Sequence, residues 1–287
     1  MCKDSLQQAS KQKKVVCEAR IVENSAVAPD TYALILDASE LAELVQPGQF
    51  IELNLRQPDL VLPRPISAYR VHEAGEYGDG SYGPLLELRY QLMGEGTRRL
   101  SAMPAGTALG IFGPLGNRWP VPEDTKSALL VGGGIGSAPL AMLAQELLDA
   151  GCEVTMVQGG RNSDLLVAAD LFETTCHKHA LATDDGSRGF EGFVTDPLQK
   201  LLKDNKSHFD VAYICGPEPM QEACSKLCEA AGIVTYVSLE RMMACGVGAC
   251  LTCVIPTTEG PRGVCCHGPI FNSKEVMWDE ARSARVH

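Results

Sequence analysis

Cysteines crowd one short segment of this 287-residue chain and constrain its fold more than any other feature. Five of the twelve cysteines fall within the 22 residues from Cys245 to Cys266. Three of them, Cys245, Cys250 and Cys253, have the spacing C-x4-C-x2-C, which is typical of plant-type [2Fe-2S] sites and needs a fourth thiolate further along the chain. Cys265 or Cys266 can supply it. The segment is therefore expected to wrap around a bound group.

Glycines in the same segment fit this chemistry. Gly246 and Gly248 tolerate positive φ angles, so a short loop can aim backbone N–H groups at the thiolate sulfurs. A structural zinc site is the alternative, because it also takes four cysteines and often contains a C-x2-C pair. The spacing of four and then two residues in a glycine-rich loop favours iron and sulfur over zinc.

Six of the seven cysteines outside this segment lie singly, mostly on predicted strands or helices, and are interpreted as small buried apolar side chains. They are Cys2, Cys17, Cys152, Cys176, Cys224 and Cys228. A disulfide framework would be spread more evenly, and the N-terminus lacks the apolar segment of a secretory signal. The reducing cytoplasm is therefore the expected compartment.

Charge and hydropathy argue against several classes of partner. The chain has 25 Lys and Arg against 36 Asp and Glu, a formal charge of −11, which argues against nucleic acid or an anionic membrane. The longest uncharged run, residues 127–145, contains several glycines and Pro139, so we expect no membrane span. With 45% hydrophobic residues the chain can bury an ordinary core, and its length favours two domains over one.

Residues 12–122 are predicted to form a small antiparallel barrel. Six short β-type runs are separated by turn residues and contain no long helix. The runs cover residues 15–22, 31–36, 49–55, 66–71, 85–92 and 108–112. Glycines in residues 72–83 predict a long surface loop between the fourth and fifth strands.

Strands alternate with helices from residue 123 to 239. This alternation predicts a doubly wound parallel sheet that is covered on both faces and forms the NAD-binding domain. Strands are expected over 128–131, 153–157, 179–183, 211–215 and 234–238, and helices over 139–148, 164–172, 196–202 and 219–230. Residues 240–275 have no usable period and are interpreted as the [2Fe-2S] cluster-binding loop segment.

Two turns at predicted strand ends are candidate nucleotide sites. Gly132, Gly133, Gly134 and Gly136 lie between a strand and a helix, where small residues let a pyrophosphate approach the positive end of the helix. The alternative is a tight turn that only permits close packing. The run Cys215-Gly216-Pro217-Glu218-Pro219-Met220 ends a later strand, the edge at which open α/β sheets bind ligands, although Gly-Pro is also an ordinary turn.

Two further motifs lie in the barrel half. Arg64-Pro65-Ile66-Ser67 joins a cation to a hydroxyl group, so Arg64 can pair with a phosphate and Ser67 can hydrogen-bond a ring nitrogen. Gly94-Glu95-Gly96-Thr97 opens a short predicted helix, and the N–H groups near Gly96 and Thr97 can hold a pyrophosphate. Neither motif is decisive alone.

Taken in order, these motifs resemble those of the ferredoxin-NADP reductase superfamily. Together with the run ERMMACGVGAC from Glu240 to Cys250, they look more narrowly like the electron-transfer subunits of NAD-dependent dihydroorotate dehydrogenases, a family that contains FAD and a [2Fe-2S] cluster. The resemblance covers about residues 12–275. The run VCCHGP, residues 264–269, is similar to the V-C-x-x-G-P that follows in the family's cluster site.

The resemblance implies roles for particular residues. It makes Cys265 the fourth cluster ligand beside Cys245, Cys250 and Cys253. It implies that FAD is lined by Arg64, Pro65, Ile66, Ser67, Arg89, Tyr90 and Gln91, with its pyrophosphate at Gly96 and Thr97. The expected NAD contacts are Gly132, Gly133, Gly134, Gly136, Asp184, Cys215, Gly216, Pro217 and Met220.

No residue is assigned to acid-base catalysis, because the chain is expected to relay electrons. Ser67 near the flavin ring and Cys215 near the nicotinamide are the nearest candidates, and the alternative for Cys215 is an ordinary buried cysteine at a strand end. Asp184 can accept a ribose hydroxyl or can belong to a solvated turn. The chain lacks a clear Arg pair for a 2′-phosphate, which favours NAD over NADP, although Arg161 keeps NADP open.

The resemblance also implies an electron path. A nicotinamide carries two electrons as hydride and an iron-sulfur cluster carries one, so a flavin has to stand between them. In the implied pathway of pyrimidine (UMP) biosynthesis, dihydroorotate is oxidised on an FMN in a separate catalytic subunit, and electrons pass through the cluster and FAD to NAD+. The expected assembly is a heterotetramer with two copies of each subunit.

Two other functions stay open. One is an NAD(P)H-dependent flavin and iron-sulfur reductase subunit for a ferredoxin, a hydrogenase or a glutamate-synthase-like partner. The other, from a different class, is a non-redox interaction module clamped by zinc.

Overall fold

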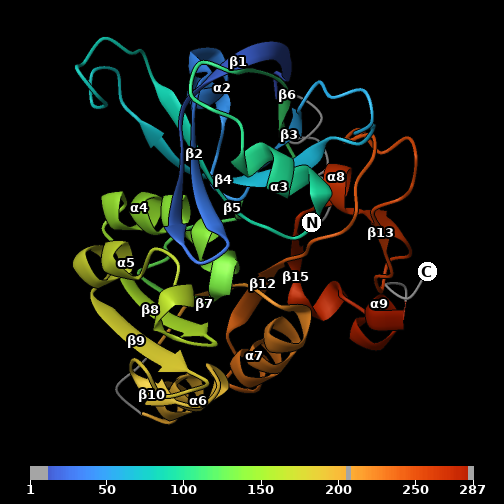
Figure 1. Ribbon diagram of the computed structural model, residues 1–287. Coiled ribbons are helices and arrows are strands. Elements are labelled where there is room, and N and C mark those ends of the chain that lie inside the picture. Colours follow the sequence, from blue (N-terminus) through green and yellow to red (C-terminus); the bar gives the residue numbers. More distant parts are fainter. Residues whose placement is uncertain (1–11, 205–207, 284–287) are drawn as a thin grey trace.

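The antiparallel barrel expected in the first part of the chain is present in the computed structural model, which describes residues 12–204 and 208–283 (Figure 1). The barrel is closed, and every neighbouring pair of strands is antiparallel. In spatial order its strands are β1 (Val15–Ala28), β2 (Thr31–Asp37), β5 (Leu85–Gln91), β4 (Arg64–His72), β3 (Phe50–Asn54) and β6 (Ala108–Leu115). The sequence did not predict α2 (Ser39–Leu44), whereas α3 (Glu95–Ser101) is the short helix expected after Gly94.

Apolar side chains at every second strand position fill the interior of the barrel. Leu34 and Leu36 on β2, like Leu86 and Leu88 on β5, lie two residues apart and are fully buried in the same core. Successive strand side chains point to opposite faces, so every second residue faces inward. The glycine-rich connection between β4 and β5 is an exposed loop in which Gly75, Gly78 and Gly80 have positive φ, as the sequence predicted.

The second part of the chain forms a seven-stranded sheet. Its spatial order is β10 (Phe190–Glu191), β9 (Lys178–Thr183), β8 (Glu153–Gly160), β7 (Ser127–Gly133), β11 (Val211–Cys215), β12 (Val234–Ser238) and β15 (Ile270–Asn272). The first six strands are parallel, as expected, but β15 pairs antiparallel with β12. The predicted parallel sheet is therefore confirmed for residues 123–239, and the antiparallel edge strand comes from the segment interpreted as loop.

Helices cover both faces of this sheet. On β7, Ala128 and Leu130 pack in one core with α4 (Ala141–Asp149) and α5 (Ala169–Thr175), while Leu129 and Val131 face α6 (Thr195–Lys203) and α7 (Glu218–Ala230). Two helices begin later than predicted, because the 3-10 helices η1 (Gly134–Leu140) and η2 (Ser163–Leu165) precede α4 and α5. Within the described ranges no helix has both the length and the apolar character needed to cross a bilayer.

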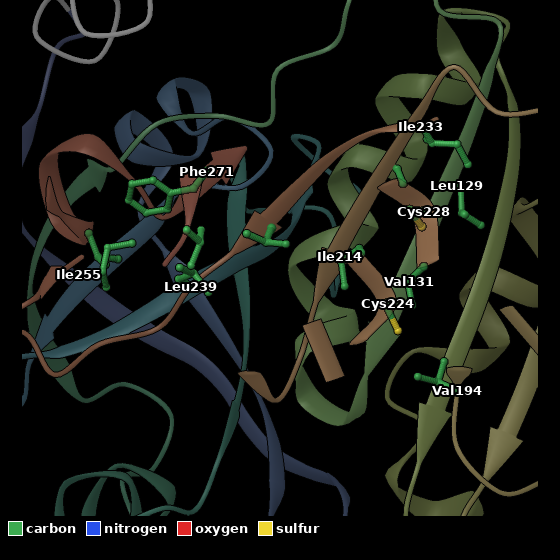
Figure 2. Packing of buried hydrophobic residues seen from close by; sticks show 14 of the residues in the cluster. Leu129, Val131, Val194, Ile214, Cys224, Cys228, Ile233, Leu239, Ile255 and Phe271 are labelled. Atoms are coloured by element: carbon green, nitrogen blue, oxygen red, sulfur yellow. The ribbon is translucent and has the colours of Figure 1, made fainter. Parts of the chain in front are cut away.

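The cysteine-rich segment carries more regular structure than its sequence suggested. It contains β13 (Val254–Ile255), β14 (Arg262–Gly263), α8 (Val264–His267) and β15, followed by the 3-10 helix η3 (Ser273–Glu275) and α9 (Trp278–Ser283). Ile255 and Phe271 from this segment belong to the same core as Leu129 and Ile214 of the sheet (Figure 2). One continuous apolar core therefore joins the cysteine segment to the sheet.

Asn117, in the connection from the barrel to the sheet, fastens the cysteine segment to the rest of the chain. Its side-chain amide donates to the carbonyls of His267 and Ile270 at 3.1 and 2.8 Å, and its Oδ1 accepts from the Ile270 N–H at 3.0 Å. Its backbone N–H donates to the Gly268 carbonyl at 2.7 Å. Asn117 thus makes hydrogen bonds to backbone groups on both sides of Pro269.

Replacing Asn117 with alanine should lower the free energy of unfolding by about 2 kcal/mol, because the carbonyls and the N–H that it satisfies lose their partners. The measurement is chemical denaturation followed by circular dichroism. Asn54→Ala is the control, since Asn54 makes one exposed hydrogen bond to the Arg56 N–H. Equal losses in the two variants would show that the Asn117 contacts add no stability.

Candidate functional site

A cavity of about 930 Å³ lies where the barrel, the sheet and the cysteine segment meet. Its wall contains most of the residues that the sequence motifs singled out: Arg64, Pro65, Ile66, Ser67, Arg89, Tyr90, Gln91, Thr97, Gly133, Gly134, Gly136, Asp184, Gly216, Pro217 and Met220. Residues more than 150 positions apart in the chain therefore face one space. A cavity of this size, built from three parts of the chain, fits a large ligand such as a dinucleotide.

On the barrel side, two arginines line the cavity from neighbouring strands. The Arg89 guanidinium pairs with the Glu87 carboxylate at 2.5 Å and lies 4.7 Å from the centre of the Tyr69 ring. Glu87 is itself held by His72, whose Nε2 lies 2.9 Å from the second carboxylate oxygen. These contacts fix the orientation of a positive charge in the cavity wall, where it can meet an anionic ligand.

Gly96 differs from its predicted role, because it is buried and does not line the cavity. A Cβ atom on Gly96 would stand 1.8 Å from the Arg64 Nε. The glycine therefore makes room for the Arg64 side chain at the start of α3, while its neighbour Thr97 faces the cavity. The Thr97 hydroxyl accepts hydrogen bonds from the N–H groups of Met93 and Gly94 at 2.9 and 3.2 Å, which shapes this turn.

The two glycine turns at the sheet edge meet where the strand order reverses, between β7 and β11. A Cβ on Gly136 would stand 2.5 Å from the Gly216 Cα, and a Cβ on Gly133 would stand 2.3 Å from the Met220 Sδ. Only glycine allows the two turns to lie this close. The carboxyl ends of parallel strands at such a reversal are the usual ligand site of open α/β sheets.

Two candidates from these turns lie behind the cavity wall. Gly132 packs against Ser137, and Cys215 is buried, which raises the pKa of its thiol above the ordinary range through desolvation. Neither residue lines the cavity, so the structure places both of them beneath its wall. Arg161 and Asp184 do line it, at the ends of β8 and β9, and the Asp184 N–H donates to the Gly160 carbonyl at 3.1 Å.

Sequence reasoning missed several wall residues that the cysteine segment and β3 contribute. They are Phe50, Leu239, Glu240, Arg241, Met243 and Pro269. Nothing in the local sequence indicates that Phe50 lines a cavity, because its pattern is that of an ordinary apolar strand residue. The ERMM run was noticed for its resemblance, but its contact with the cavity follows only from the way the chain returns to the barrel.

A buried ion pair joins the cysteine segment to the nucleotide turn. Arg241 Nη1 lies 3.1 Å from the Glu218 carboxylate at the start of α7, and both side chains are more than nine-tenths buried. Arg241 also donates to the carbonyls of Glu240 and Ala281 at 2.8 and 3.2 Å. These contacts hold the start of α7, the residues before Cys245 and helix α9 together.

The candidate cluster cysteines lie in two pairs. The Cys250 N–H donates to the Cys245 sulfur at 3.4 Å, and the Cys265 N–H donates to the Cys253 sulfur at 3.4 Å. In the described part of the chain no three Cys, His, Asp or Glu side chains gather closely enough to share one metal ion. A [2Fe-2S] cluster takes two protein ligands on each iron, so two pairs match its donor set.

The pairs also differ in exposure. Cys253 and Cys265 are buried in the core that contains Phe50 and Met243, two residues of the cavity wall. Cys245 is half-buried, and Cys250 is exposed. The apolar side chains of Met242, Val247 and Leu251, near the outer pair, are 72%, 53% and 69% exposed. One pair thus faces the cavity side and the other faces solvent.

Hydrogen bonds prepare these thiols for metal binding. The Cys265 thiol donates to Cys253 and lowers its pKa to about 6, while the pKa of Cys265 rises as the donor. Hydrogen bonds from Thr252 lower the pKa of Cys250 to about 7. Gly246 and Gly248 have φ angles of 63° and 79°, and the Gly248 N–H reaches the Cys265 sulfur. These donors fit the thiolates of an iron-sulfur cluster.

Cys266 lies beside the inner pair, and its thiol is hydrogen-bonded with that of Cys265. Its sulfur is 3.1 Å from the His267 Nδ1 and 3.7 Å from the Gly263 carbonyl oxygen. Cys152, Cys224 and Cys228 are buried, as expected, and Cys17 and Cys176 are half-buried. Cys2 lies outside the described residues. All the described cysteines are free thiols, so none is bridged.

Two family comparisons match separate parts of the chain. Residues 240–277 match the family described as iron-sulfur cluster binding domain of dihydroorotate dehydrogenase B. Residues 130–226 match the oxidoreductase NAD-binding domain. The first match contains the four paired cysteines, and the second contains the glycine turn after β7.

Curated relatives match nearly the whole chain. The electron transfer subunit of dihydroorotate dehydrogenase B (NAD(+)) from Desulforamulus reducens is 34% identical over 269 residues, which are 92% of this chain and 99% of that protein. The subunit of the same name from Shouchella clausii is 37% identical over 264 residues, or 90% of this chain and 96% of that protein.

A solved structure agrees with these relatives. The NADH-dependent reduced ferredoxin-NADP oxidoreductase, studied for flavin-based electron bifurcation, superimposes with a TM-score of 0.80 at 29% identity. The match covers 93% of this chain and 92% of that one. The barrel, the sheet and the cysteine segment therefore occur together elsewhere.

The pairing predicts that Cys265, and not its neighbour, is the fourth cluster ligand. Cys265→Ser should lose most of the bound iron and sulfide, because the pair with Cys253 is broken. Cys266→Ser, the matched control one residue away, should keep both. The measurement is the iron and sulfide content of anaerobically purified protein, with circular dichroism to verify folding. Loss in the Cys266 variant alone would reverse the assignment.

Proposed function

We propose, because the chain belongs to the family of electron transfer subunits of dihydroorotate dehydrogenase B, that it passes electrons from dihydroorotate oxidation on a partner subunit to NAD+. The electrons would enter at the cysteine segment and leave at the cavity. The observation that carries this proposal is that the inner thiol pair, Cys253 and Cys265, shares a buried core with Phe50 and Met243 of the cavity wall.

The cavity would hold FAD and receive the nicotinamide of NAD+. When bound, FAD exchanges two electrons with a nicotinamide and single electrons with an iron-sulfur cluster. Arg64 and Arg89 would neutralise its negative charge, and Ser67, Tyr90 and Gln91 would line it on the barrel side. The turns at Gly133 to Gly136 and at Gly216 would receive the NAD+ pyrophosphate.

Our choice between NAD+ and NADP+ rests on two charged residues of the cavity wall, at the ends of β8 and β9. Asp184 would accept a ribose hydroxyl of the bound nucleotide, and its negative charge would oppose a 2′-phosphate there. Arg161 lines the same part of the wall and is one cation, not the pair that a phosphate favours. NAD+ is therefore our choice over NADP+.

The outer thiol pair would face the partner. Cys250 and the neighbouring apolar side chains are exposed, as a surface for docking and electron entry requires. We expect the partner to be the FMN-containing catalytic subunit, with two copies of each chain in the assembly. The reducing cytoplasm stays the predicted compartment, on the argument from the cysteine distribution.

A reductase for a different partner is the second candidate. It is favoured by the similarity to the ferredoxin-NADP oxidoreductase structure over nearly the whole chain. The two functions differ in the electron donor, so copurification with a flavoprotein that oxidises dihydroorotate would select the first.

The experiment that tests the proposal is an ultraviolet-visible spectrum of anaerobically purified protein, before and after NADH, with iron, sulfide and zinc assayed on the same sample. Flavin bands and a broad iron-sulfur absorbance should both bleach, since hydride from NADH can run the path backwards. A colourless protein that contains zinc would overturn the proposal and support an interaction module.

Cys250→Ala separates the two halves of the path. It should remove the cluster and cut electron transfer to the partner, while NADH still reduces FAD because the cavity is untouched. The readout is the rate of flavin bleaching beside the rate of partner reduction. Cys176→Ala, at a half-buried cysteine far from the cluster in sequence, is the control. Loss of both activities in Cys250→Ala would instead indicate that the cluster is needed for folding.

A further inference from the structure

A carboxylate of the barrel reaches the cysteine segment. Glu52 lies on β3, and its residue is only 5% exposed. A Cβ atom on Gly246 would stand 2.8 Å from both the Cδ and the Oε2 of Glu52. The carboxylate therefore lies directly against the backbone of the residue that follows Cys245.

This carboxylate is not paired with the arginine that lines the same groove. Glu52 lines a groove of about 500 Å³ on the outside of the barrel, together with Glu18 and Arg56. Arg56 pairs with Glu18 at 2.6 Å, at the exposed rim. Glu52 Oε1 is buried and has no hydrogen-bond partner among the described residues. A buried oxygen of this kind is costly and calls for an explanation.

Strand β3 contributes both to the cavity wall and to the contact with the cysteine loop. Phe50, two residues before Glu52, lies in the cavity wall, and alternate strand residues share a face. The outer face of one short strand thus carries an apolar ring toward the cavity and a carboxylate toward the cysteine loop. Neither residue belongs to the segment that would bind the cluster.

We propose that Glu52 sets the reduction potential of the iron-sulfur cluster, an inference that rests on the proposed function of the four cysteines. Net charge, hydrogen bonds and solvent exposure determine such potentials. Burial raises the pKa of the Glu52 carboxyl group. Once ionised, it places a negative charge beside the four thiolates, which disfavours one more electron, so Glu52 lowers the potential. The lower potential favours passage of the electron onward to the flavin in the cavity.

The test is Glu52→Gln, which removes the charge and keeps the shape of the side chain. The midpoint potential of the cluster, measured by a redox titration followed by electron paramagnetic resonance, should move to a more positive value. The titration is made at a pH well above the pKa of the carboxyl group. The FAD potential and the iron, sulfide and flavin contents should stay unchanged, and electron transfer from cluster to FAD should slow.

Glu18→Gln is the matched control, because Glu18 lines the same groove but is exposed and paired with Arg56. It should leave the cluster potential unchanged. If Glu52→Gln does not assemble the cluster, Glu52→Ala relieves the contact with Gly246 and should show the same positive shift.

The outcomes distinguish a failure of this inference from a failure of the proposed function on which it rests. A fully loaded Glu52 variant with an unshifted or more negative cluster potential would overturn the role of Glu52 and leave electron transfer intact. Equal shifts in the Glu18 and Glu52 variants would also overturn it, since the effect would not be specific to the buried carboxylate. Wild-type protein without iron and sulfide would instead overturn the proposed function.

Discussion

The antiparallel pairing of β15 with β12 is the constraint on which the rest of the structure depends. It joins the chain that leaves the cysteine loop to the sheet that carries the nucleotide turns. Asn117 fastens the same strand to the end of the barrel, and the Arg241–Glu218 ion pair fastens the entry to the loop. The cysteine loop is therefore held against both halves of the cavity.

Charge divides the site into two environments. The cavity contains Arg64 and Arg89, and the second is oriented by a chain of contacts through Glu87 to His72. Such a wall favours anionic nucleotides. The cysteine loop instead lies beside the Glu52 carboxylate. The role proposed for Glu52 rests on this negative charge beside the thiolates.

The sequence predicted most of the architecture, because each part has a strong local pattern. Alternation identified the barrel strands, and the strand-helix rhythm identified the sheet. Neither pattern predicted β15. Its three residues are too few to show a period, and they are extended only because β12 offers an unpaired edge. Gly96, Gly132 and Cys215, which were also expected near the ligands, are not among the residues that line the cavity. A motif shows which turn approaches a ligand but does not show which of its side chains face inward.

By itself the sequence determined the donor set and its spacing, since the interval between cysteines limits how a short loop can wrap around a metal cluster. It likewise determined the glycine turns, because only glycine permits the backbone approach between Gly136 and Gly216. Only the tertiary structure decided that one thiol pair is buried and the other is more exposed, that Phe50 lies in the cavity wall, and that Glu52 lies against the cysteine loop. These features are contacts between residues nearly 200 positions apart, and packing of the whole chain creates them.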